Sequence, residues 1–235
     1  MTQTQQQARI QILISGTGSN ALNIAKEVQQ GVLKGLGEIT QVISNRPTAK
    51  GLAASQEMGI NTACVDHKDY ETKADFEAAL IAKIEEKPYD IIVLAGFMRI
   101  LSAEFVSHFA GKVINIHPSL LPDYKGLNTH QRVLDAGEKH HGVTVHLVIP
   151  DLDAGPIIGQ AMLNINEDDS AESLHRRIQA MEYWLYPQCL RMILSGEIQL
   201  EADRVVFKAQ QLQKTATGVQ PWQEEMILNS SAQAQ

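Results

Sequence analysis

An asparagine, a histidine and an aspartate are the residues of this sequence best suited to proton-transfer chemistry. Asn115 and His117 stand two residues apart in the stretch NIHPSLLP, so an extended backbone points both side chains to the same side. An amide and an imidazole held side by side form a donor pair suited to an oxyanion. Asp153 follows in the turn-forming stretch LDAGPI. Its carboxylate, if near His117, would favour the imidazolium, which can donate a proton near neutral pH.

The histidines raise the alternative of a metal site, because six of the eight fall between His108 and His146. The sequence has no H-E-x-x-H or H-x-H motif, and asparagine is a poor zinc ligand, so we expect no metal. It also has no G-x-S-x-G motif, and neither Cys64 nor Cys189 stands in an electropositive loop, which argues against a covalent acyl-enzyme. Acyl-type transfer directly between two bound substrates is the chemistry that remains.

A glycine loop, SGTGSN at residues 15 to 20, is the next candidate for binding and follows an apolar run. Its small residues would let backbone amides converge at a helix N-terminus, an arrangement that favours an anion such as phosphate. The loop also matches G-x-G-x-x-A, but the acidic residue of NAD-binding proteins, expected about 20 positions later, is absent. Two alternatives stay open: NADP binding through Arg46, and glycines that serve only a tight turn.

The stretch GFMRIL, residues 96 to 101, follows a strongly apolar run. Its four apolar side chains, Phe97, Met98, Ile100 and Leu101, are candidates to wall a flat pocket. Simple core packing is the alternative, and we expect it for about half of them. Arg99 inside this run needs either an exit to solvent or an anionic partner.

The elements that would position these residues alternate between short apolar runs and helical patterns, which is typical of βαβ units. The expected strands are 9 to 15, 39 to 44, 61 to 65, 90 to 95, 112 to 116, 141 to 148 and 157 to 164, and the expected helices lie near 20 to 30, 49 to 58, 73 to 86, 102 to 109 and 170 to 194. Ligands of such sheets bind beyond the carboxyl ends of the strands. We therefore predict an α/β, Rossmann-like fold with a mostly parallel central sheet of about seven strands and helices on both faces.

Composition narrows the class of protein. The chain has 235 residues, of which 44% are hydrophobic, enough for a sizeable core. A net charge of -7 gives a polyanion little to bind, so we expect small-molecule partners and no nucleic acid. The sequence has no apolar core of a signal peptide at its N-terminus and no run of about 18 apolar residues, the length that a membrane span needs. We therefore expect a cytoplasmic protein without a membrane partner.

We expect a single domain over residues 9 to 222, with disordered tails at 1 to 8 and 223 to 235. Cys64 and Cys189 each stand in an apolar stretch, and we expect both to be buried, reduced thiols.

The strings SGTGSN, LAGFMRIL, NIHPSLLP, HGVTVH and LDAGPI, in this order and spacing, resemble the phosphoribosylglycinamide formyltransferase (GAR transformylase) family of folate-dependent enzymes, from about Ile10 to Leu194. The resemblance implies the formyltransferase fold. It also implies transfer of the formyl group of 10-formyltetrahydrofolate to the glycine amine of 5-phosphoribosylglycinamide, giving formylglycinamide ribonucleotide and tetrahydrofolate in de novo purine (IMP) synthesis. The folate would be a co-substrate, with no metal and no nicotinamide, and the enzyme would be a monomer or homodimer.

The resemblance further implies roles for individual positions. Asn115 and His117 would stabilise the oxyanion as the substrate amine attacks the formyl carbon, while Asp153 would keep His117 charged and assist proton transfer. The ribonucleotide would be bound by Gly18, Ser19, Asn20, Gln179 and Glu182, although Glu182 on a solvated helix face is the alternative. The folate would contact Lys73, Met98, Arg99, Ile100, Leu101, Asn115, Ile149, Pro150, Asp151, Leu152 and Asp153.

Three positions depart from the family pattern. Lys73 stands where many relatives carry an arginine directed at the folate, and lysine lacks the bidentate geometry of arginine. Asn128 stands at the first histidine of the common string GLHTH, whereas His130 is retained. Ala154 replaces a frequent glycine.

Alternative functions come from relatives and from an unrelated class. Formyltetrahydrofolate hydrolase and methionyl-tRNA formyltransferase share the Asn-x-His and Asp residues but carry an extra domain, for which the sequence has no room at either end. An NADP-binding oxidoreductase remains an alternative on the glycine loop alone, and a non-catalytic module that binds a phosphorylated metabolite is a third.

Overall fold

The computed structural model describes residues 6 to 208 and 225 to 227. The chain divides into two compact units, Met1–Ile114 and Asn115–Gln235. Among the residues described, no helix has the length and hydropathy that crossing a membrane would require.

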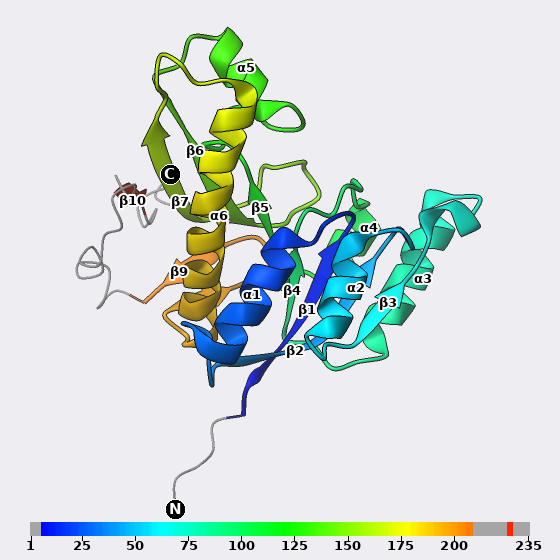
Figure 1. The fold of residues 1–235 in the computed structure, drawn as a ribbon. Helices are drawn as coiled ribbons and strands as arrows, with labels where there is room; N and C mark the ends of the chain where they lie inside the picture. The colour runs from blue at the N-terminus through cyan, green and yellow to red at the C-terminus, as the bar shows by residue number, and fades with distance from the viewer. Residues whose placement is uncertain (1–5, 209–224, 228–235) are drawn as a thin grey trace, which may run out of the picture. The chain divides into compact units, whose positions relative to one another are not determined.

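The first unit alternates strands and helices along the chain (Figure 1). Its elements are β1 (Ala8–Ile14), α1 (Ser19–Gln30), β2 (Gly37–Ser44), α2 (Lys50–Glu57), β3 (Thr62–Cys64), the 3-10 helix η1 (His67–Asp69), α3 (Lys73–Glu85), β4 (Ile91–Leu94), α4 (Ala103–His108) and the beginning of β5 (Val113–His117). The strand order is β5-β4-β1-β2-β3. Strand β1 pairs in parallel with β2 and with β4, and β2 pairs in parallel with β3.

Helices cover both faces of β1. Its side chains point alternately to one face and to the other, and those of both faces meet a helix. On one face, Gln11 Nε2 donates to the carbonyl oxygens of Ile84 and Lys87 at 2.8 and 2.9 Å, which ties β1 to the end of α3. On the other face, the side chain of Ile14 approaches Gly51 of α2 so closely that a Cβ on Gly51 would lie 2.6 Å from it. The α/β layering predicted from the sequence is confirmed.

The second unit contains the end of β5 and a largely antiparallel set of strands. Its elements are α5 (Thr129–Asp135), β6 (His140–Leu147), β7 (Ile157–Asn164), α6 (Ala171–Leu194), β8 (Ile198–Leu200), β9 (Val205–Phe207) and β10 (Glu225–Ile227). The strand order is β5-β6-β7-β10, and β8 and β9 form a separate pair. Strand β7 is antiparallel to both β6 and β10.

Helix α6 packs on β6 and β7 through one apolar stripe. Leu174, Ile178, Met181 and Leu185 recur at helical spacing along it, and all are buried. The helix begins as predicted, since Ser170 caps it and exchanges hydrogen bonds with Ser173 in a capping box.

The predicted strands and helices are all present, with ends that agree within two residues. Five short elements were not predicted, namely η1, α5, β8, β9 and β10, which have three to seven residues each. Ala8 and Glu225–Ile227 stand in strands, although they were assigned to the tails, whose outer residues lie outside the described part of the chain. A single domain over residues 9 to 222 stays a prediction.

The cysteine prediction is half wrong. Cys189 is buried, whereas Cys64 is exposed. Cys64 is the last residue of β3, a three-residue strand at the end of its sheet. A short edge strand has few neighbours to cover it, which explains the exposure of an apolar residue there.

Candidate active site

The end of β5 carries Asn115 and His117 on the same side of the strand, as the spacing predicts. The alternate residues Ile114 and Ile116 are buried in the opposite direction, with 0% and 7% exposure. Asn115 Nδ2 lies 3.2 Å from His146 Nε2, and His117 Nδ1 lies 3.4 Å from Asp153 Oδ2. His146 Nε2 also lies 3.8 Å from Asp153 Oδ1. The second unit thus brings the three predicted catalytic residues together, with His146 among them.

The ring of His117 is held from both sides and is only 6% exposed. Its Nε2 lies 3.0 Å from the carbonyl oxygen of Tyr124. A carbonyl oxygen only accepts, so Nε2 carries a hydrogen. The other nitrogen, Nδ1, therefore faces the carboxylate of Asp153 and any ligand beside it.

Asp153 owes its position to a tight turn after β6. Its backbone is left-handed, with φ of 45°, and its Oδ2 accepts a hydrogen bond of 3.0 Å from the N–H of Gly126. Two residues later, a Cβ on Gly155 would lie 1.8 Å from the carbonyl oxygen of Leu147. Only glycine fits there, which explains how the turn folds back against the end of β6 and presents the carboxylate.

His146 orients Asn115, a role that was not predicted. Its Nδ1 donates to the carbonyl oxygen of Leu147 at 3.0 Å, so its Nε2 accepts from the amide of Asn115. Burial lowers the pKa of His146, which favours this neutral form. The amide nitrogen of Asn115 has a second N–H, which can donate to a ligand. In the sequence of β6, Val143, Val145 and Leu147 alternate with Thr144 and His146, which indicates a polar face for His146 but not its partner.

A chain of three histidines lies elsewhere in the second unit. His130 Nδ1 is 2.9 Å from His141 Nε2, and His130 Nε2 is 3.2 Å from His175 Nδ1. Both ring nitrogens of His130 face a neighbouring histidine, so the nitrogens of the three rings do not point at one shared position. Over the described ranges, no group of three or more His, Cys, Asp or Glu side chains is arranged to hold a metal ion.

The glycine loop of the first unit leads into the N-terminus of α1. Gly18 precedes the helix with φ of 68° and has no side chain to cap it, and the first turn holds no acidic residue. The amides of this turn are thus suited to an external anion. Gly18 also serves packing, since a Cβ there would lie 3.0 Å from Cα of Gly51 in α2. The positive φ and the close approach both require glycine at position 18, and they leave both the anion and the tight-turn explanation of the loop open.

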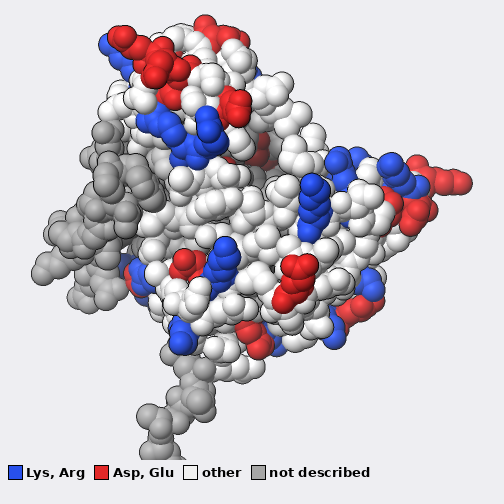
Figure 2. Space-filling view, in the orientation of Figure 1, with Lys and Arg blue, Asp and Glu red and all other residues white. Residues whose placement is uncertain are grey.

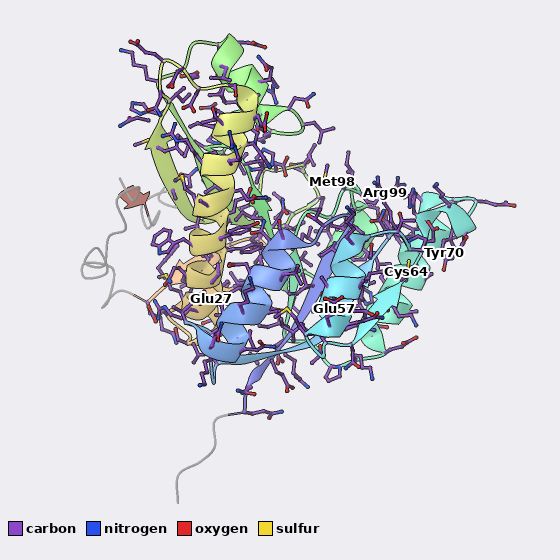
Figure 3. All side chains as sticks on the ribbon, viewed as in Figure 1. Glu27, Glu57, Cys64, Tyr70, Met98 and Arg99 are labelled. Atoms are coloured by element: carbon purple, nitrogen blue, oxygen red, sulfur yellow. The ribbon has the colours of Figure 1, made fainter. Side chains whose placement is uncertain are left out.

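The stretch after β4 divides as expected between core and surface. Phe97 and Leu101 are each 9% exposed, whereas Met98 and Ile100 are 56% and 65% exposed. Figure 3 shows Met98 and Arg99 beyond the end of β4. Arg99 reaches solvent, with its guanidinium carbon 6.0 Å from the centre of the Phe76 ring.

Two hydrogen bonds fix this stretch within the first unit. The N–H of Met98 donates to Ser15 Oγ at 2.7 Å, and Ser15 Oγ in turn donates to Asn45 Oδ1 at 2.5 Å. At the other end, the N–H of Ser102 donates to Glu77 Oε1 at 2.8 Å. The same carboxylate oxygen lies 3.8 Å from Lys73 Nζ, so Lys73 is brought close to the end of the stretch.

The remaining predicted residues belong to the second unit. In the turn after β6, Pro150, Asp151 and Leu152 are exposed, and Ile149 is half-buried. Gln179 and Glu182 are half-buried and three residues apart on α6, so they share one helix face.

On the face shown in Figure 2, basic and acidic side chains are interspersed.

Comparisons with known proteins agree with this arrangement. The family model described as formyl transferase matches residues 8–190. Phosphoribosylglycinamide formyltransferase of Escherichia coli (strain K12) is 38% identical over 203 residues, which cover 86% of this chain and 95% of that protein. The solved phosphoribosylglycinamide formyltransferase of Coxiella burnetii superimposes with a TM-score of 0.81 and 45% identity, covering 86% of this chain and 94% of that one. The predicted fold class is confirmed.

A longer relative contains a similar region. The trifunctional purine biosynthetic protein adenosine-3 of Bos taurus is 43% identical over 193 residues, which cover 82% of this chain but only 19% of that protein. The match to the bacterial enzyme, in contrast, spans nearly the whole of it. The chain belongs to the phosphoribosylglycinamide formyltransferase family of formyl transferases.

Proposed function

We propose that this protein transfers the formyl group of 10-formyltetrahydrofolate to the glycine amine of 5-phosphoribosylglycinamide, in purine synthesis. The observation that carries the proposal is the arrangement around Asp153: His117 Nδ1 at 3.4 Å on one side and His146 Nε2, which holds Asn115, at 3.8 Å on the other. Two donors and a carboxylate acceptor are the groups that direct acyl transfer to an amine requires.

The reaction follows from these groups. The amine attacks the formyl carbon, and the carbonyl electron pair moves onto the formyl oxygen. Asn115 Nδ2–H and His117 Nδ1–H donate to this oxyanion, and Asp153 helps to remove the proton that the attacking amine loses. Collapse of the intermediate breaks the bond to N10 of the folate, which takes up a proton and leaves as tetrahydrofolate.

For the ribonucleotide, we assign Gly18, Ser19 and Asn20 to the phosphate. The support is the start of α1, which has no side-chain cap on Gly18 and no acidic residue in its first turn. Gln179 and Glu182 of α6 are assigned to the glycinamide part, where a carboxylate would hold an amine.

To the folate we assign the following residues: Lys73, Met98, Arg99, Ile100, Leu101, Asn115 and 149 to 153. Large exposed apolar side chains support the assignment, since Met98 and Ile100 and also Leu152, which is 49% exposed, are suited to a flat aromatic ring. We further propose that the protein acts without metal or nicotinamide, as a cytoplasmic monomer or homodimer.

The test is a transfer assay with purified protein. Tetrahydrofolate should form from 10-formyltetrahydrofolate only when 5-phosphoribosylglycinamide is present, with one formylglycinamide ribonucleotide per folate consumed. Release of formate without the ribonucleotide would indicate the hydrolase instead. Quenching of protein fluorescence by NADPH, with no formyl transfer, would support the oxidoreductase.

A further inference from the structure

The segment 124 to 127, which we name the clamp loop, holds both His117 and Asp153 through its backbone. The carbonyl oxygen of Tyr124 accepts from His117 Nε2 at 3.0 Å. The N–H of Gly126 donates to Asp153 Oδ2 at 3.0 Å. The placement of these two side chains therefore depends on the backbone conformation of the clamp loop.

That conformation is unfavourable by itself. Tyr124 has φ of 54°, Gly126 has φ of 79° and Asn128, directly after the loop, has φ of 56°. Residues with a Cβ rarely adopt this left-handed region, and tyrosine is less suited to it than asparagine. Such a backbone persists when contacts from outside the loop hold it.

Arg132 of α5 supplies these contacts. Its Nη1 donates to the carbonyl oxygen of Lys125 at 2.7 Å and lies 3.4 Å from that of Leu127. Its guanidinium carbon lies 5.4 Å from the centre of the Tyr124 ring, within the range of a cation–π interaction. A second restraint acts on the same ring, because the Tyr124 hydroxyl donates to Glu138 Oε1 at 2.7 Å.

We propose that Arg132 is a positioning residue for formyl transfer. By fixing the clamp loop, it keeps the Tyr124 carbonyl on His117 Nε2 and the Gly126 amide on the carboxylate of Asp153. Nδ1 of His117 then stays directed at Asp153 and the reacting formyl group. Arg132 is exposed and touches none of these groups directly, so its effect passes through the loop. The catalytic part of this proposal rests on the proposed function.

The kinetic test compares three variants. Arg132→Ala should lower kcat by about 10- to 100-fold, since small misplacements of catalytic groups cost that much, with KM for the ribonucleotide changed far less. Arg132→Lys keeps the positive charge but not the planar guanidinium group, so its kcat should lie between those of Arg132→Ala and wild type. Gln131→Ala is the matched control, because Gln131 is exposed on the same helix and donates only to Asp135 within it, at 2.7 Å; it should keep the wild-type kcat.

A second readout does not depend on activity. In nitrogen-15 NMR of the free protein, His117 Nε2–H should be protected from exchange in wild type and in Gln131→Ala, and should exchange faster in Arg132→Ala. Unchanged exchange in Arg132→Ala would overturn the proposal, whatever happens to kcat. If wild type transfers the formyl group, a kcat of Arg132→Ala equal to that of wild type would overturn it as well. If wild type transfers no formyl group, the proposed function fails, and the exchange measurement still decides whether Arg132 holds the loop.

Discussion

Asp153 combines an unusual backbone with two polar partners, which makes asparagine an informative replacement. Asparagine tolerates a left-handed backbone such as φ of 45° and keeps an oxygen to accept from the N–H of Gly126. The turn should therefore survive in Asp153→Asn, and only the negative charge beside His117 is lost. A role in the turn and a role in charge can thus be separated.

For Asp153→Asn we expect kcat to fall, because an amide cannot take up the proton that the attacking amine loses. Steady-state rates of formyl transfer, measured together with ribonucleotide affinity by calorimetry, check this. If kcat matches wild type, Asp153 only supports the turn.

Residue types predicted the candidate catalytic group, but not what holds it. Asn115, His117 and Asp153 could be named because their spacing and side chains indicate chemistry. The partners of His117 and Asp153 in the clamp loop are backbone groups of Tyr124 and Gly126, which no side-chain pattern reveals. Their geometry depends on left-handed backbone angles, and the sequence indicates these only weakly.

At the scale of elements, the approach of α1 to α2 depends on two glycines that touch. A Cβ on Gly18 would lie 3.0 Å from Cα of Gly51, and one on Gly51 would lie 2.9 Å from Cα of Gly18. A side chain at Gly18 would therefore point at α2 and not at an anion bound by the amides of the glycine loop. Its first effect would be on stability.

Gly18→Val should lower the free energy of unfolding by roughly 2 to 4 kcal/mol, through the left-handed φ of 68° and the contact with α2. Gly16→Ala is the control, because a Cβ on Gly16 meets nothing within 4 Å. Urea unfolding of both variants checks the prediction. Equal stability of Gly18→Val and wild type would show that the helices separate without cost.

The long periodic elements could be predicted from the sequence because each buries a face. Helix α6 carries an apolar stripe over 24 residues, and the strands β1 and β4 lie in apolar runs of the sequence. Helix α5 has seven residues, yet it carries Arg132 and His130. Its formation depends on tertiary contacts of buried Thr129 and Val133, which local sequence does not specify.

At the scale of the whole molecule, buried histidines make stability depend on pH. Burial, together with the charge of neighbouring histidines, lowers the pKa of both His130 and His141 to about 4. Unfolded, each would titrate near 6.5. As the pH falls below that value, the unfolded chain takes up protons that the folded chain excludes. The stability is therefore complete above pH 6.5 and is lost progressively toward about pH 4.

Wild type should accordingly lose roughly 1 to 3 kcal/mol of unfolding free energy through these histidines between about pH 7 and pH 5. His130→Asn removes the central ring, so part of this dependence should vanish. Urea unfolding at both pH values provides the comparison. Identical slopes of stability against pH in wild type and His130→Asn would contradict the account of the histidine chain.

The central claim is that Asn115 and His117 stabilise the oxyanion of formyl transfer, and His117→Ala tests it most directly. Single-turnover and steady-state rates of formyl transfer to 5-phosphoribosylglycinamide should fall by about 100- to 1000-fold, the usual cost of losing one oxyanion donor. Ribonucleotide affinity measured by calorimetry should stay close to wild type, because the ring is not assigned to that ligand. A variant that transfers the formyl group at a rate near wild type would contradict the account.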